Sequence, residues 1–185
     1  MAYTEADIKE NELLAMSPEI LDILLKDHTT QCNIFWATDS YSHLGKGFAY
    51  SDQITAEKIT SGYGKIIIPR AAKSSDTQRQ RSREMAEVFT PSWICNKQNK
   101  LIDNAWFGRE NVFNSEVDAS DGSHIWIVND NHITFPEGKT WRDYVGDTRM
   151  EITCGEAPYL VSRYDTVSGE YIPIEKRIGL LDRKL

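Results

Sequence analysis

The stretch from Met150 to Leu160, Met-Glu-Ile-Thr-Cys-Gly-Glu-Ala-Pro-Tyr-Leu, places the strongest constraint on what this chain can fold into. An acid, Glu151, comes first, a turn of small residues through Gly155 follows, and Pro158 opens a new segment. Glycine tolerates positive φ and leaves room for a ligand, and proline suits the first turn of a helix. The order predicts a strand-to-helix turn close to a ligand, with the carboxylate and the helix amides facing the same space.

This stretch resembles the first motif of adenine-specific DNA methyltransferases. In that family an acid, a small-residue loop and a Pro-aromatic-Leu ending hold the methionine part of S-adenosylmethionine. Upstream, the segment Val-Phe-Thr-Pro-Ser-Trp-Ile at 88–94 resembles the Phe-Thr-Pro element that precedes the motif in the same enzymes. The two elements occur in the family's order. From about Asn33 to its end, the chain resembles the front half of methylation subunits of bacterial restriction-modification systems.

The resemblance implies a binding site for the cofactor S-adenosylmethionine. Thr90 and Pro91 would border the cofactor, and Glu151 with the loop from Cys154 to Tyr159 would hold its methionine end. The implied cofactor-binding residues are therefore Thr90, Pro91, Glu151, Cys154, Gly155, Pro158 and Tyr159. The sequence departs from the family pattern at Ile152, where proline is usual, and at Ala157, where glycine is common. An added methyl group would crowd the ligand, so weak or absent cofactor binding is one expectation.

Two further elements that such an enzyme needs do not occur in the sequence. One is a second strand that ends in an acid for the cofactor's ribose, and Asp182 lies inside a helical pattern that does not fit this role. The other is an Asn-Pro-Pro-Tyr-like motif that holds the flipped adenine. The apolar pattern also runs to Leu185 without a helix stop signal. We therefore expect the N-terminal part of a methyltransferase, truncated and inactive alone, and we assign no catalytic residue.

The charge of the chain is unevenly distributed. A net charge of −7 argues against nonspecific attraction to nucleic acid. Between residues 70 and 83, however, five cations stand against the single acid Asp76, and these cations are Arg70, Lys73, Arg79, Arg81 and Arg83. They form either a solvated helix face or a DNA-binding face, since arginine is well suited to phosphate. The resemblance adds double-stranded DNA as the partner and, as a further partner, a restriction subunit.

Composition indicates a soluble globular protein, with 40% apolar and 26% charged residues. The sequence has no apolar run near the ~20 residues that cross a bilayer, and its start lacks the pattern of a secretion signal. The three cysteines cannot all pair, which favours reduced thiols and a cytoplasmic location. His124 and His132 have no partner at metal-ligand spacing, so we expect no metal site.

The hydrophobic patterns predict an α/β fold, with a helical N-terminal layer and an incomplete Rossmann-like S-adenosylmethionine-dependent methyltransferase sheet. We expect an N-terminal helical or mixed region with a basic helix over 1–87, and the start of a methyltransferase-like domain over 88–185. Helices are predicted over 4–16, 18–28, 52–59, 74–89, 140–145 and 175–185, and from a Thr90 cap with Pro91 first to 102. Strands are predicted over 32–36, 65–68, 125–128 and 132–135 and at Glu151, with a hairpin over 164–174.

Another class of function stays open on these observations. The chain could be a noncatalytic module that binds DNA or a partner subunit through its basic helix, with a degenerate methyltransferase fold. A nuclease has little support, because the paired acids and the Asp/Glu-x-Lys arrangement of such sites do not occur after a predicted strand.

Overall fold

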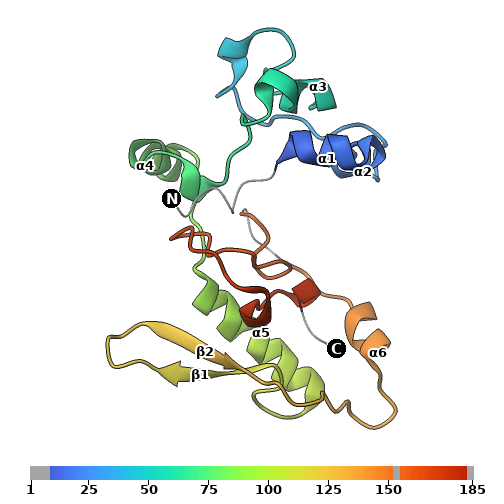
Figure 1. Cartoon of the computed structure of the whole chain (residues 1–185), viewed down its shortest axis with the longest axis vertical. Helices are drawn as coiled ribbons and strands as arrows, with labels where there is room; N and C mark the ends of the chain where they lie inside the picture. The colour runs from blue at the N-terminus through green and yellow to red at the C-terminus, as the bar shows by residue number, and fades with distance from the viewer. Residues whose placement is uncertain (1–8, 152–154, 183–185) are drawn as a thin grey trace. The chain divides into compact units, whose positions relative to one another are not determined.

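The computed structural model describes residues 9–151 and 155–182, and these fall into two compact units (Figure 1). The N-terminal unit contains the described residues up to Ile68, and the C-terminal unit contains those from Pro69 onward. The predicted start of the methyltransferase-like region at residue 88 lies inside the C-terminal unit.

The N-terminal unit begins with two short helices, α1 (Glu10–Met16) and α2 (Pro18–Leu25). As predicted, the Ser17 hydroxyl caps α2 by accepting a hydrogen bond from the Ile20 amide, and Pro18 is the first helical residue. Leu21 and Leu25 recur at helical spacing and are buried in the core of this unit. That core also contains Trp36, Phe48, Ile54 and Ile59. The predicted cap at Thr4 lies outside the described residues.

The two strands predicted for the N-terminal unit do not form. Within 32–36, only isolated bridges join Asn33 to Lys26 and Phe35 to Gln53, because Gln31 and Ala37 on either side have positive φ and end the extended run. At 65–68, the amides of Lys65 and Ile66 turn back to the carbonyl of Tyr63. The remaining elements are short: η2 (Ser42–Leu44), α3 (Ala56–Ile59) and η3 (Ser61–Tyr63).

The helices of the C-terminal unit follow the sequence pattern in part. They are η4 (Arg70–Ala72), α4 (Ser75–Glu84), α5 (Ser92–Phe107), α6 (Trp141–Gly146), η5 (Ile174–Lys176) and η6 (Leu180–Asp182). Ser74 caps α4 as predicted, and Thr140 with Asp143 forms a capping box at the predicted α6. Helix α4 ends at Glu84 rather than near 89, because Ala86 adopts positive φ.

Two predicted helix boundaries are wrong for identifiable reasons. Pro91 takes the N-cap position of α5 instead of Thr90, and the free amide of Ser92 donates to the Asp165 carboxylate at 2.7 Å. The helix predicted over 175–185 is replaced by the separate turns η5 and η6 in its described part. Between them the Ser162 hydroxyl accepts hydrogen bonds from the amides of Ile178 and Gly179, at 2.7 and 3.1 Å, which removes these amides from any helical pattern.

The described residues contain one sheet, the antiparallel pair β1 (Asn114–Asp118) and β2 (His124–Val128), with Asn114 opposite Val128. Strand β2 is as predicted, β1 forms where no strand was predicted, and the strands predicted over 132–135 and at Glu151 do not form. The hairpin lies beside α5 (Figure 1), and the buried amides of Asn96 and Asn114 exchange two hydrogen bonds there, at 3.0 and 2.8 Å. The fold is thus a mixed helical and antiparallel α/β fold, and the Rossmann-like sheet stays a prediction.

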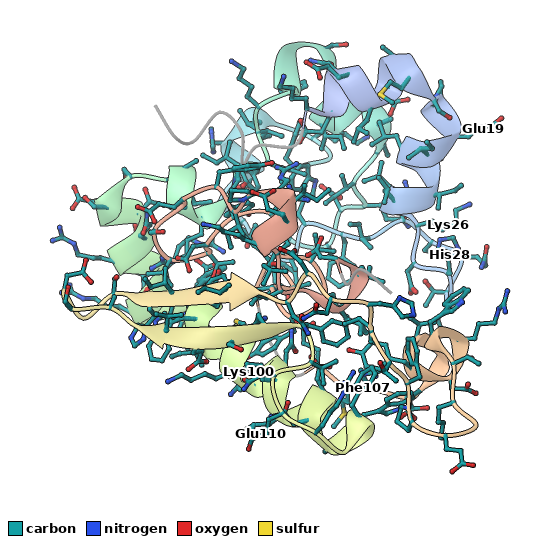
Figure 2. The ribbon with its side chains drawn as sticks, turned by 60° about the horizontal axis from the view of Figure 1, so that its bottom comes forward. Glu19, Lys26, His28, Lys100, Phe107 and Glu110 are labelled. Atoms are coloured by element: carbon teal, nitrogen blue, oxygen red, sulfur yellow. The ribbon has the colours of Figure 1, made fainter. Side chains whose placement is uncertain are left out.

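The core of the C-terminal unit is aromatic. Phe107, at the C-terminal end of α5 (Figure 2), packs with Phe113 and Tyr144, whose ring centroids lie 5.6 and 5.4 Å away. Tyr144 is completely buried, and its hydroxyl donates to Asp103 at 2.5 Å. This hydrogen bond fixes α6 on α5. The predicted hairpin over 164–174 reduces to one bridge, between Tyr164 and Tyr171, with Gly169 in its turn at φ 77°.

We predict that Asp165→Ala destabilises the protein by about 1–3 kcal/mol, because it leaves the part-buried amide at the start of α5, and the exposed amides of the 165–169 turn, without their acceptor. Asp165 accepts hydrogen bonds from Ser92, Val167 and Ser168 at 2.7, 3.0 and 2.7 Å. Burial opposes ionisation, but these hydrogen bonds outweigh it and hold the pKa of Asp165 below its ordinary value.

Because its folded-state pKa is lowered, Asp165 contributes stability that is present above the ordinary aspartate pKa and is lost as pH falls through the folded value. Urea unfolding at pH 7 and at pH 3 measures this. The difference in the free energy of unfolding between wild type and Asp165→Ala should be smaller at pH 3 than at pH 7. The exposed control Asp130→Ala should change this free energy little at either pH. An equal difference at both pH values would contradict the prediction.

Candidate functional site

A cavity of about 480 Å³ opens in the C-terminal unit between α5, the end of α6 with the residues that follow it, and the loop at Tyr159. This volume lies within the roughly 300–1,000 Å³ of small-molecule sites. Its lining combines charged, polar and apolar side chains, namely Gln98, Asn99, Ile102, Asp103, Tyr144, Arg149, Met150, Glu151, Tyr159, Leu160 and Leu180. The cavity suits a ligand that is partly charged and partly apolar.

Helix α5 forms one wall of the cavity. Gln98, Asn99, Ile102 and Asp103 follow the i, i+3, i+4 spacing and therefore share one helix face. The Asn99 amide nitrogen donates to the carbonyls of Tyr159 and Ile178, at 3.2 and 3.0 Å. The Tyr159 hydroxyl donates to the side-chain oxygen of Gln98. These bonds hold the loop that carries Tyr159 against the helix.

The two segments that resemble methyltransferase elements meet next to this cavity. We call the described residues 155–159 the cofactor loop. A Cβ atom at Gly155 would lie 3.4 Å from two ring carbons of Phe89, so the loop passes close to the Phe-Thr-Pro element. The pKa of Tyr159 is raised by burial and by the nearby Cys95 thiol, while the Thr90 side chain opposes the shift. Segments far apart in the sequence therefore lie side by side here.

The predicted cofactor residues take different positions in this arrangement. Glu151 and Tyr159 line the cavity, Pro158 is buried and is not among the lining residues, and Cys154 lies outside the described residues. Pro91 begins α5, and the Thr90 carbonyl accepts hydrogen bonds from the Thr166 hydroxyl at 2.9 Å and the Cys95 thiol at 3.7 Å. Thr90 thus has structural contacts, and its place beside the cofactor stays a prediction.

The backbone of the cofactor loop is strained at Ala157. Its φ is 50°, in the left-handed region that favours glycine. A non-glycine residue there costs about 1–2 kcal/mol. Ala157 is the position at which the resemblance leads us to expect glycine, and alanine here adopts a conformation that glycine would take without strain.

The predicted DNA-binding residues separate into two groups in the structure. We call residues 70–83 the basic segment. Arg79 and Arg83 are exposed on α4. Arg81 donates to both carboxylate oxygens of Glu87, at 2.8–3.0 Å, and the Arg70 guanidinium lies over the Phe89 ring, 4.9 Å from its centroid. Arg79 and Arg83 are therefore the members best placed to contact a phosphate backbone.

Lys73 lies in the inner part of the basic segment. Burial and the neighbouring Arg81 lower the pKa of Lys73, while the Glu87 and Glu156 carboxylates oppose this shift. The crowding of Arg70, Lys73 and Arg81 around two acids leaves an excess positive charge there.

The sequence interpretation missed several residues of the cavity. Gln98, Asn99 and Asp103 could have been found from the polar row that they form on α5 at i, i+1 and i+5. Arg149 carried no such signal, because its place depends on how the chain returns after α6. Its guanidinium donates to the Tyr144 carbonyl at 2.6 Å and lies 4.5 Å from the centre of the Tyr144 ring.

Comparison with models of protein families, with curated proteins and with solved structures finds no significant match to this chain.

Within 9–151 and 155–182, no group of three or more His, Cys, Asp or Glu side chains could hold a metal ion. In the same part of the chain, no helix has the length and apolar character needed to cross a membrane. The site is therefore interpreted from its own chemistry.

We predict that Cys95 resists alkylation in the folded protein while Cys32 reacts. Burial raises the pKa of the Cys95 thiol to about 11, whereas Cys32 is exposed. Alkylating reagents attack the thiolate, which is scarce at pH 8 for such a thiol. Iodoacetamide labelling at pH 8, followed by peptide mass mapping, should modify Cys32 first. Both thiols should react in urea. Equal alkylation rates of Cys32 and Cys95 in the folded protein would contradict the prediction.

Proposed function

We propose that this chain forms the start of the S-adenosylmethionine site of a DNA adenine methyltransferase from a restriction-modification system. The proposal carries with it the Rossmann-like sheet and the cytoplasmic location of that enzyme class. The observation that supports it most directly is the meeting of the Phe89-Thr90-Pro91 element and the cofactor loop beside a 480 Å³ cavity. Two elements that are far apart in the sequence, and that each resemble a part of the family's cofactor site, therefore lie close together.

The chemistry of the cavity is compatible with this cofactor. S-adenosylmethionine carries an ammonium group, a carboxylate and a sulfonium cation, together with a ribose and a flat aromatic base whose faces are apolar. Glu151 and Asp103 offer carboxylates, Arg149 offers a cation, and Tyr159 with Ile102 and Leu160 offers apolar surface. In the proposed function these residues bind and orient the cofactor. Transfer of the methyl group would depend on alignment with the adenine amino group, which needs residues that the sequence does not identify.

The titration of S-adenosylmethionine into the full chain, followed by calorimetry, tests this proposal. We predict saturable binding that Glu151→Ala weakens about 10- to 100-fold, because a hydrogen bond to a charged group contributes about 1.5–3 kcal/mol. Glu110→Ala is the matched control, since Glu110 is an exposed acid in the loop after α5 (Figure 2). Absence of binding, or equal binding by the Glu151 variant, would reject the cofactor site.

Within the same proposal, the exposed arginines of α4 contact the DNA phosphates. We predict that Arg79→Ala with Arg83→Ala weakens duplex binding at all sequences and reduces the slope of log K against log salt by about 2, one for each phosphate contact. Fluorescence anisotropy of a labelled duplex over a salt series measures this. The control is Arg142→Ala on α6, whose guanidinium lies over the Trp141 ring. An unchanged slope would contradict phosphate contact by α4.

A noncatalytic module that binds DNA or a subunit is the second candidate. It is favoured by one observation, that the sheet of the described residues is a two-stranded antiparallel hairpin rather than a parallel sheet. The two experiments above separate the candidates. Duplex binding through Arg79 and Arg83 without any binding of S-adenosylmethionine would favour the module.

A further inference from the structure

Glu156 joins the cofactor loop to the basic segment. One oxygen of its carboxylate accepts a hydrogen bond from the backbone amide of Arg70, at 2.9 Å, and the other accepts one from the Tyr164 hydroxyl. Glu156 lies inside the cofactor loop, directly after Gly155. Both oxygens of this half-buried carboxylate are therefore used to hold the loop to residue 70 and to the chain that follows the loop.

A second contact joins the same two segments. The Arg70 guanidinium lies over the Phe89 ring, and the same ring faces Gly155. Arg70 thus contacts the cofactor loop directly through its backbone amide, which donates to Glu156, and indirectly through its side chain, because the Phe89 ring lies near both the guanidinium and Gly155. Any change in the position of Arg70 must move one of these contacts.

The residues that follow Arg70 are partly or fully buried. Ala71 is buried, with 5% of its surface exposed, and Lys73 is half-buried. Charge interactions connect Lys73 to Arg70, Arg81, Glu87 and Glu156. This group of three cations and two acids has one positive charge in excess. A phosphate near Lys73 would balance that charge and hold the stretch from Arg70 to Lys73 in place.

We propose that Glu156 is a positioning residue that couples duplex DNA at the basic segment to the cofactor loop. This proposal rests on the proposed function. DNA that fixes the stretch from Arg70 to Lys73 also fixes the amide that Glu156 binds, so the loop loses less conformational freedom when the cofactor arrives. Duplex therefore tightens the binding of S-adenosylmethionine. By thermodynamic linkage, the cofactor tightens duplex binding by the same factor.

The test is the affinity of the full chain for S-adenosylmethionine, measured by calorimetry with and without a saturating duplex at low salt. In the wild type we expect the duplex to tighten cofactor binding at least about 5-fold, the lower end of ordinary coupling. Glu156→Ala should bring this ratio to about 1. Glu156→Gln should keep part of it, because the amide oxygen still accepts from the Arg70 amide, and Tyr164→Phe should also give an intermediate ratio.

Two controls separate coupling from simple damage to the fold. Glu170→Gln removes an exposed acid of the same unit and should keep the wild-type ratio. Arg79→Ala with Arg83→Ala should weaken duplex binding yet keep the ratio once the duplex saturates, because these exposed arginines make no contact with Glu156 among the described residues. A wild-type ratio in Glu156→Ala overturns the proposal. So does an equal loss of cofactor affinity with and without duplex, which is what a merely structural role produces.

If Glu156→Ala fails to fold, the Gln and Phe variants decide, and unchanged ratios in both overturn the coupling. If the wild type binds no S-adenosylmethionine, the cofactor part of the proposed function fails, and hydrogen exchange then judges the coupling separately. Amides of residues 155–161 should gain protection when a saturating duplex is added to the wild type and should gain clearly less in Glu156→Gln. Protection that does not respond to the duplex overturns the coupling.

Discussion

The C-terminal unit depends on the hydrogen bonds that buried or half-buried polar side chains make to helix α5. Asp165 binds the first amide of the helix, Asn96 binds Asn114 of the hairpin, and Asp103 binds Tyr144 of α6. Each bond joins the helix to a different segment, and each would leave a polar group without a partner if it broke. The helix is therefore positioned by polar contacts along its length as well as by the aromatic core at its end.

Local signals in the sequence predicted several helix starts correctly. The Ser17-Pro18 start and the Ser74 cap form as predicted, and the helical turns predicted from Thr140 begin with a capping box, because each of these signals depends on residues within one turn. The strand at 32–36 was wrong because Gln31 and Ala37 have positive φ and end the extended run, and the strand at 65–68 was wrong because its first amides turn back to the Tyr63 carbonyl. The final helix was wrong because Ser162, far away in the sequence, captures two of its amides.

The candidate site shows the same division between local and distant information. The motif at 150–160 directed attention to Glu151 and Tyr159, which line the cavity. The cavity wall formed by α5 could be predicted only in part, from the row of polar residues on that helix. The position of Arg149 could not be predicted. The residues of the predicted basic face do not all stay available to a ligand. Arg81 donates to the carboxylate of Glu87, beyond the end of α4, and the Arg70 guanidinium lies over the Phe89 ring. Charge patterns in a sequence do not show which charges will be neutralised by the fold.

The reciprocal amide pair of Asn96 and Asn114 has a consequence for the hairpin. Ile125 and Ile127 on β2 are 48% and 65% exposed, so burial of apolar side chains does not fix which face of this ribbon turns toward α5. A slip of one residue would bring Ser115 to the place of Asn114. The buried side-chain amide of Asn96 would then lose its hydrogen-bond partner. Recognition between two identical side chains therefore helps to set the alignment of the ribbon on α5, together with the stack of His124 on Trp93, in the way that a polar pair helps to set the register of a coiled coil.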